Sequence, residues 1–191
     1  MTTAARRLLH RSSTKVLFAA LVAAATVAPA RAQLKVGDPA PGFALEATLA
    51  GEPFRFDLDQ ALKKGPVVLY FYPKAFTRGC TLEANAFAEA SAQYKSLGAT
   101  VIGVSGDDIE TLKKFSVSEC RNQFAVGADH DRRVMKSYQA TLPLIDGYAK
   151  RISYVITPAH RIAFAYESMG HEEHVPRTLA AVKALVADNP R

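Results

Sequence analysis

Runs of apolar residues separated by polar turns predict a series of short strands. Residues 67–72 and 100–105 are continuous stretches of mainly β-branched and aromatic side chains, which is typical of strands buried on both faces of a sheet. Residues 52–58 alternate between polar and apolar side chains, as a half-buried strand does. Residues 34–46 look extended. Further strands are expected at residues 124–126, 152–156 and 161–166.

Helical periodicity occurs between these strands. In residues 108–120, Ile109, Leu112 and Phe115 fall on one face, as in an amphipathic helix packed against a core. Further helices are expected over residues 81–97, 132–138 and 174–187. Strands that alternate with helices predict an α/β domain with parallel strand pairing. No repeat or linker divides residues 33–191, so we expect one domain there.

The first 32 residues have the composition of a cleaved secretory signal peptide. Basic residues come first, a run of about thirteen apolar residues follows at 16–28, and Ala30-Arg31-Ala32 supplies a small-x-small cleavage pattern before Gln33. A membrane anchor is the alternative, but a spanning helix needs roughly 20 apolar residues. We therefore expect an exported protein, and the compact signal favours a bacterial periplasm, where the surroundings are oxidising.

The net charge of +6 comes mostly from this first segment. It holds five basic residues and no acidic one, which leaves 19 basic and 18 acidic residues in the remainder. The mature domain is thus close to neutral, and its basic pairs lack the aromatic neighbours typical of nucleic-acid binding. We expect no nucleic-acid partner, and no membrane association once the signal has been removed.

The chain has two cysteines, and the position of Cys80 indicates reactivity. Cys80 follows the strand at 67–72 and a turn, and it lies where the next helix begins. Unpaired N–H groups and the positive end of the helix dipole favour the thiolate there. Thr77, three residues earlier, could hydrogen-bond the sulfur or an oxygen of a bound substrate. These polar neighbours fit a reactive thiol better than a buried structural cysteine.

The residues around Cys80 resemble the peroxiredoxin active-site pattern P-x-x-x-T-x-x-C. The match comprises YFYPK at residues 70–74 and TRGCTLEA at residues 77–84, and it is closest to the peroxiredoxin Q, or bacterioferritin-comigratory, branch. Agreement continues at flanking segments: VGDPAP at 36–41, IGVS at 102–105 and RISYVI at 151–156. The resemblance extends over residues 34–187. It implies a thioredoxin-like α/β fold, with a central mixed sheet flanked by helices, and thiol peroxidase activity.

The resemblance also implies roles for individual residues. Cys80 would be the peroxidatic cysteine, which a hydroperoxide oxidises to a sulfenic acid. Pro73 would shield that acid, Thr77 would orient the peroxide, and Arg151 would stabilise the thiolate and the charge that develops on the O–O bond. Without the resemblance, Arg151 looks like an ordinary surface arginine at the start of a strand. Glu83 would either join the supporting hydrogen bonds or remain an exposed glutamate in the first helical turn.

Two positions depart from this branch. Arg78 replaces the proline that usually precedes Gly-Cys, and Asn85 stands where many members carry a resolving cysteine, five residues after Cys80. The remaining thiol is Cys120, whereas members that resolve from this second helix do so nearer Ser116. Two mechanisms stay open: an intramolecular Cys80–Cys120 disulfide, which we favour, and a one-cysteine mechanism. Because a disulfide needs Cα atoms within about 7 Å, both regions would have to unravel locally if they start further apart.

The partners that the resemblance implies are a hydroperoxide, either hydrogen peroxide or an organic one, and a thioredoxin-like or other thiol reductant. Metal, haem and flavin are not expected. His171 and His174 lie three residues apart, but no third metal ligand is indicated. We expect a monomer or a weak homodimer.

Two other functions are compatible with the residues. The first is an exported thiol–disulfide oxidoreductase, although that chemistry uses C-x-x-C, and Thr77 and Glu83 occupy the positions three before and three after Cys80. The second is a non-catalytic thioredoxin-like domain with a structural Cys80–Cys120 disulfide. The reactivity of the two thiols distinguishes these functions.

Overall fold

The computed structural model describes residues 33–145 and 147–188; the predicted signal peptide at 1–32 lies outside the described residues. The strands are β1 (Ala44–Leu49), β2 (Glu52–Asp57), β3 (Val67–Phe71), β4 (Thr100–Ser105), β5 (Ala125–Ala128), β6 (Ile152–Ile156) and β7 (Ile162–Glu167). The helices are α1 (Leu58–Leu62), α2 (Arg78–Ser96), α3 (Ile109–Ser118), α4 (Arg133–Ser137) and α5 (His174–Asp188).

Within the described ranges, the seven strands form one mixed sheet in the order β2-β1-β5-β4-β3-β6-β7. The central strands β3, β4 and β5 pair in parallel, as the alternation of strands and helices predicts, and the outer strands pair antiparallel. Parallel strands bring their carboxyl ends to the same edge of a sheet, where α/β proteins place their sites. The segments that follow β3, β4 and β5 therefore meet at that edge.

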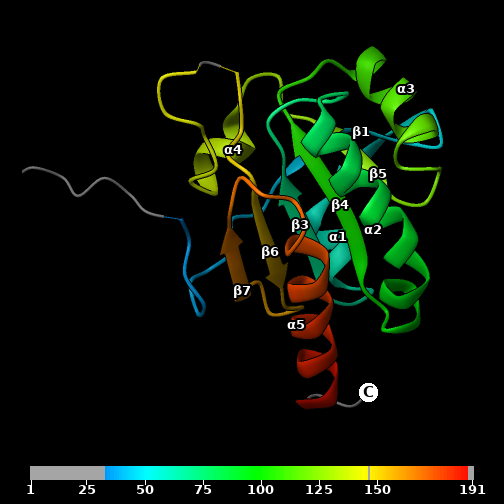
Figure 1. The fold of residues 1–191 in the computed structure, drawn as a ribbon. Coiled ribbons are helices and arrows are strands. Elements are labelled where there is room, and N and C mark those ends of the chain that lie inside the picture. The colour runs from blue at the N-terminus through cyan, green and yellow to red at the C-terminus, as the bar shows by residue number, and fades with distance from the viewer. Residues whose placement is uncertain (1–32, 146, 189–191) are drawn as a thin grey trace, which may run out of the picture. The chain divides into compact units, whose positions relative to one another are not determined.

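Helices cover both faces of the sheet. Along β3, Val68 and Tyr70 pack with residues of α2, α3 and α5, whereas Leu69 and Phe71 pack with residues of α1 and α4. Figure 1 shows α2 and α5 together on one face. Because both faces are buried, β3 and β6 are uninterrupted buried runs. The thioredoxin-like α/β architecture with a central mixed sheet is confirmed.

Several elements differ from the expectation, among them β1, which ends at Leu49, beyond the predicted extended segment 34–46. Helix α1 was not predicted, because five residues are too few to show a helical period; Asp57 caps it by accepting from the Gln60 N–H at 3.0 Å. Helix α2 begins at Arg78, three residues earlier than predicted. In the described part of the chain, no helix is long and apolar enough to cross a membrane.

Candidate active site

The β3–α2 connection positions Cys80. The chain leaves the sheet after β3, turns over residues 72–77 and enters α2 at Arg78, so Cys80 is the third residue of the helix. Its side chain lies in the first helical turn, as expected, and Cys80 is only 2% exposed. The unpaired N–H groups of this turn favour a negative charge on the sulfur. The surrounding residues Phe76, Thr77 and Arg78 are exposed.

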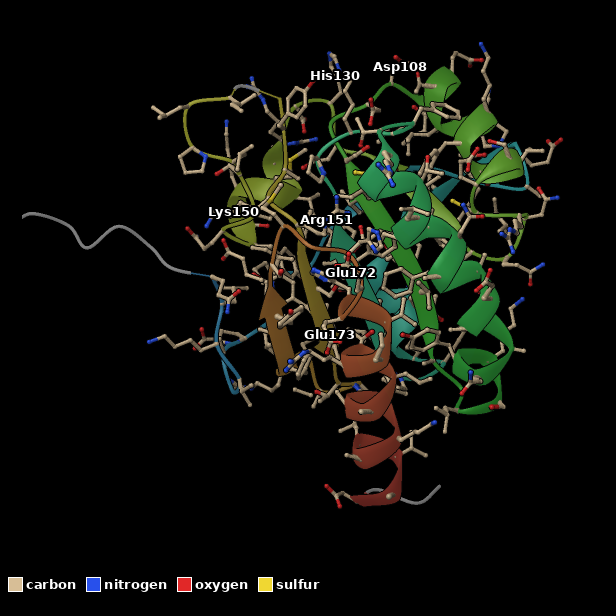
Figure 2. All side chains as sticks on the ribbon, in the orientation of Figure 1. Asp108, His130, Lys150, Arg151, Glu172 and Glu173 are labelled. Atoms are coloured by element: carbon tan, nitrogen blue, oxygen red, sulfur yellow. The ribbon has the colours of Figure 1, made fainter. Side chains whose placement is uncertain are left out.

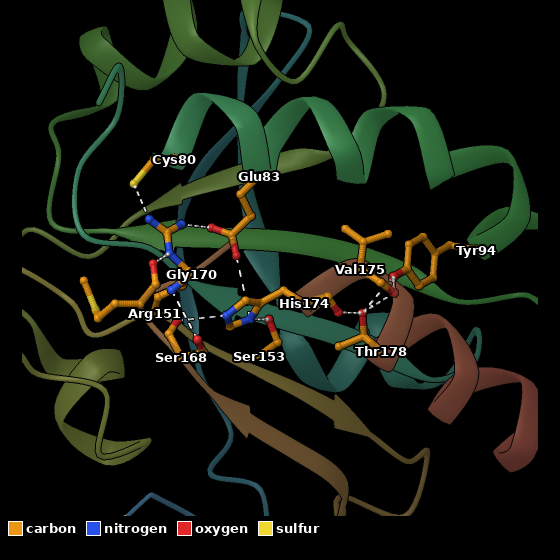
Figure 3. A network of polar contacts seen from close by, with 11 residues as sticks. Cys80, Glu83, Tyr94, Arg151, Ser153, Ser168, Gly170, His174, Val175 and Thr178 are labelled. Carbon is orange, nitrogen blue, oxygen red and sulfur yellow. Dashed lines mark hydrogen bonds and ion pairs between the residues drawn. The ribbon is translucent and has the colours of Figure 1, made fainter. Parts of the chain in front are cut away.

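Arg151 contacts the thiol from the neighbouring strand. Strand β6 lies antiparallel beside β3 with Ile152 opposite Phe71. This register places Arg151, the residue before β6, at the end of β3 where the chain continues toward Cys80. The Arg151 Nη2 atom donates to Cys80 Sγ at 3.4 Å (Figure 3). Arg151 is only 4% exposed, so reading it as a surface arginine is wrong. The guanidinium supplies a buried positive charge at the sulfur.

The remaining donors of Arg151 fix its orientation. Its Nη1 atom donates to Glu83 Oε2 in an ion pair, and its Nε donates to the Met169 carbonyl at 3.1 Å. Glu83 is fully buried on α2, one turn after Cys80; the alternative of an exposed glutamate is therefore wrong. Burial raises the pKa of Glu83, and Arg151 partly opposes this shift. Glu83 and Cys80 raise the pKa of Arg151 against the effect of its burial.

A buried histidine extends this network, a place that the sequence did not indicate. His174, at the start of α5, is fully buried; its Nε2 lies 3.0 Å from the Ser168 carbonyl and its Nδ1 lies 2.8 Å from Ser153 Oγ (Figure 3). Burial lowers the pKa of His174 to about 4, so the ring is neutral at physiological pH. Because a carbonyl only accepts, Nε2 carries the proton and Nδ1 accepts from Ser153. The Nδ1 atom also lies 3.8 Å from Glu83 Oε1.

The other residues predicted on the β3–α2 connection, Pro73 and Thr77, lie on the same turn. Pro73 is half-buried and directly follows Tyr72 at the end of β3. Thr77 is the N-cap residue of α2, and its hydroxyl donates to the Lys74 carbonyl at 2.9 Å. The hydroxyl proton is thus committed within the turn, and the lone pairs on the oxygen stay available as acceptors.

Cys120 lies just beyond the end of α3 and is fully buried. It belongs to the same hydrophobic cluster as Cys80, which also contains Tyr70 and Tyr72. Burial raises the pKa of the Cys120 thiol, and Glu119 adds to the shift. Both cysteines are free thiols in this structure. The two sulfurs thus share one cluster without a bond between them.

Two acidic residues precede α5. Glu172 and Glu173 are exposed at the start of the helix (Figure 2), where negative charge complements the helix dipole. Among the described residues, no group of three or more histidine, cysteine, aspartate or glutamate side chains is arranged to hold a metal ion.

Comparisons with known proteins agree with this geometry. Residues 36–165 match the AhpC/TSA family. A chloroplastic peroxiredoxin Q from Triticum aestivum is 36% identical over 64% of this chain, a match that spans only 57% of the wheat protein. Its counterpart from Oryza sativa subsp. japonica is 33% identical over 87% of this chain and 81% of the rice protein.

A solved structure shows the same fold. The crystal structure of peroxidoxin BcpB from Mycobacterium tuberculosis superposes with a TM-score of 0.71 at 29% identity, and the match covers 80% of this chain and 98% of that one. The family match extends from the segment before β1 into β7, and so includes the β3–α2 turn, Cys80 and Arg151. The chain belongs to the AhpC/TSA family, in which these named relatives are peroxiredoxins.

Proposed function

We propose that this protein is a thiol-dependent peroxidase that reduces hydrogen peroxide and organic hydroperoxides through Cys80. The observation that carries the proposal is the contact between Arg151 Nη2 and Cys80 Sγ, 3.4 Å long and buried at the N-terminus of α2. A guanidinium and a helix terminus both favour a thiolate over a thiol. The thiolate is the nucleophilic form of cysteine, and family membership supports the same chemistry.

In the first step, the Cys80 thiolate attacks one oxygen of the hydroperoxide. An S–O bond forms and the O–O bond breaks, so sulfur is oxidised by two electrons and the peroxide is reduced to an alcohol or water. The proton on the attacked oxygen moves to the leaving oxygen, so Cys80 becomes a sulfenate, and a proton from solvent converts it to the sulfenic acid. Arg151 would stabilise the negative charge on both oxygens, because Glu83 and Met169 hold its guanidinium in place before substrate binds.

Thr77 and Pro73 would complete the substrate site. With its proton donated to the Lys74 carbonyl, the Thr77 hydroxyl can accept the hydrogen of a peroxide O–H and so orient it toward the sulfur. Pro73 has no N–H to offer and lies half-buried at the end of β3, a position suited to shielding the sulfenic acid from a second peroxide.

In the second step, Cys120 would attack the sulfenic sulfur of Cys80. An S–S bond forms, the S–O bond breaks, and the oxygen leaves as water with the proton of the Cys120 thiol. A thioredoxin-like or other dithiol reductant would then reduce this disulfide and become oxidised itself. Cys120 is buried and its pKa is raised, so it becomes an effective nucleophile only when its segment opens.

The end of α3 has features that favour such opening. Directly after Cys120, Arg121 and Asn122 have φ values of 49° and 60°, in the left-handed region that non-glycine residues adopt at an energetic cost. Asn85 on α2 donates to Glu119 Oε2 at 3.4 Å. This bond places the Cys80 helix beside the Cys120 segment, which supports a disulfide between the two, and the bond has to break when the segment opens.

Peroxide consumption by cysteine variants tests the proposal. Cys80→Ser should abolish turnover, whereas Cys120→Ser should retain the first oxidation and lose recycling through the disulfide. Wild-type-like turnover by Cys80→Ser would overturn the assignment.

Peptide mapping under non-reducing conditions tests the second step. After one equivalent of peroxide, the wild-type protein should yield a linked peptide pair that contains Cys80 and Cys120. A sulfenic acid that persists on Cys80, or a bond from Cys80 to an added external thiol, would indicate a one-cysteine mechanism instead.

We also propose that residues 1–32 direct export to the periplasm, because their basic start, short apolar run and small-x-small end match a signal peptide. N-terminal sequencing of the protein from its native cells should begin at Gln33. A protein that still carries residues 1–32 would contradict cleavage.

A further inference from the structure

A buried carboxylate connects three loops beside the proposed peroxidatic site. Asp107 follows β4 at the carboxyl edge of the sheet, and its side chain is 5% exposed. Its Oδ2 atom accepts from the Ala75 N–H at 2.8 Å and from Ser105 Oγ at 2.9 Å. Ala75 lies in the middle of the β3–α2 turn, so the carboxylate fixes this turn directly to the end of the neighbouring strand.

The same carboxylate reaches a third loop through Lys74. The Lys74 Nζ atom lies 3.5 Å from Asp107 Oδ1, and it also lies 5.5 Å from the centre of the Tyr148 ring. The backbones come close as well, because a Cβ atom at Gly106 would collide with the Gly147 carbonyl. Asp107 therefore joins the turn before Cys80 to two loops that do not carry the thiol.

The residue after Ala75 is held in an unfavourable conformation. Phe76 has a φ of 63°, which a non-glycine residue adopts only when its surroundings enforce it. Its ring is half-exposed and rests edge-on against Phe115 of α3, with centroids 5.2 Å apart. The turn would relieve this strain by opening, and the hydrogen bond from Ala75 to Asp107 opposes that opening.

We propose that Asp107 is a positioning residue that keeps the β3–α2 turn closed, and that release of its bond to Ala75 is a step on the way from the Cys80 sulfenic acid to the disulfide with Cys120. The first part rests on geometry alone, and the second part rests on the proposed function. The closed turn holds Cys80 against Arg151 for the first oxidation. The open turn frees Cys80 to reach Cys120.

Asp129 provides a matched control. It follows β5 at the same edge of the sheet, is also buried, and also accepts backbone N–H groups: Val134 at 3.2 Å and Met135 at 2.7 Å. These bonds cap α4 and do not involve the Cys80 turn. Asp107→Ala and Asp129→Ala thus each remove a buried carboxylate that binds backbone amides, but only the first should loosen the turn before Cys80.

Hydrogen exchange of the reduced protein tests the first part without any reaction. In Asp107→Ala, amides of residues 74–80 should exchange about tenfold faster than in wild type; in Asp129→Ala they should change less than threefold. An increase below threefold in Asp107→Ala, or an equal increase in Asp129→Ala, overturns the proposal that Asp107 keeps the turn closed. If Asp107→Ala does not fold, Ser105→Ala replaces it in the same experiment with the same thresholds, because this change removes the hydroxyl that orients the Asp107 carboxylate.

Single-turnover kinetics test the second part. After one equivalent of peroxide, Asp107→Ala should form the disulfide at least threefold faster than Asp129→Ala, whereas its first oxidation, measured in a Cys120→Ser background, should be at least threefold slower. Equal or slower disulfide formation overturns the coupling. If wild-type protein consumes no peroxide, the proposed function fails, and the second part of the proposal fails with it. Hydrogen exchange still tests separately whether Asp107 keeps the turn closed.

Discussion

The Nη2 atom of Arg151 lies 3.4 Å from the Sγ atom of Cys80, although 71 residues separate them in the chain. Antiparallel pairing of β6 with β3 creates this proximity. The guanidinium is buried and makes two further hydrogen bonds, to Glu83 and to the Met169 carbonyl. An oriented, desolvated cation at the sulfur would stabilise the charge that develops in the proposed attack of the thiolate on a peroxide.

Removal of this cation should slow the oxidation of Cys80. We expect Arg151→Met to lower the second-order rate constant with hydrogen peroxide by about a hundredfold, the typical effect of losing one preorganised donor. Arg151→Lys keeps the charge but loses the planar guanidinium with its several N–H donors, so its rate constant should lie between those of wild type and Arg151→Met. Stopped-flow measurement decides, with Arg177→Met on the exposed face of α5 as the control. Equal rates for Arg151→Met and wild type would contradict the role.

Gly79→Ala should separate activity from stability. A Cβ atom at residue 79 would lie 3.1 Å from Arg151 Nη2, so the guanidinium must shift by a few tenths of an ångström. Alanine is also a better helix former than glycine. We expect several-fold slower oxidation of Cys80 and a melting temperature that is equal or higher. A variant with full activity would show that the position of the guanidinium is not critical.

His174 should make stability dependent on pH. Its native pKa is lowered to about 4, whereas an unfolded histidine titrates near 6.5. Between these values the unfolded chain binds the extra proton, so stability falls as the pH falls from about 6.5 to about 4, by about 3 kcal/mol. His174→Gln lacks this titration.

Urea unfolding at several pH values checks this expectation. The stability advantage of wild type over His174→Gln should be largest near pH 7 and should shrink toward pH 4. Glu83 contacts the same ring and is present in both proteins, and His171→Gln is the matched control. An advantage that stays constant with pH would contradict a neutral, buried imidazole.

Gly103→Ala should destabilise the fold itself. A Cβ atom there would lie 2.6 Å from Cζ of Tyr70, a fully buried ring that stacks on Phe87 of α2 with centroids 4.3 Å apart. Overpacking of this kind costs about 1–3 kcal/mol. Gly42→Ala is the control, because its Cβ would meet only the end of the exposed Asp59 side chain. Equal unfolding free energies for the two variants would refute the packing.

Local patterns predicted much of this fold and part of its site. Buried runs identify β3 and β4 because strands covered on both faces are continuously apolar, and the position of Cys80 after β3 indicated a helix N-terminus. The short helix α1 carried no period that could be recognised. An element could be predicted when enough consecutive residues showed its pattern, as in β3 and β4, and could not when it was as short as α1.

Long-range contacts could not be predicted in the same way. Arg151 was identified only by the resemblance to peroxiredoxins, since no local pattern distinguishes it from a surface arginine. The sequence places His174 three residues from His171, a spacing that suggests a weak metal pair, whereas its structural partners are Ser153 and Ser168. The Asp107–Ala75 bond spans 32 residues. Such partners are brought together by the register of the sheet, which a single sequence does not display.

The most direct test of the central claim is chemical trapping of the Cys80 sulfenic acid. Cys120→Ser protein is treated with one equivalent of hydrogen peroxide in the presence of dimedone, and the labelled peptide is identified by mass spectrometry. The proposed mechanism predicts stoichiometric label on Cys80, and none in a Cys80→Ser/Cys120→Ser control. Absence of label on Cys80, with the peroxide left unconsumed, would contradict a peroxidatic role for this cysteine.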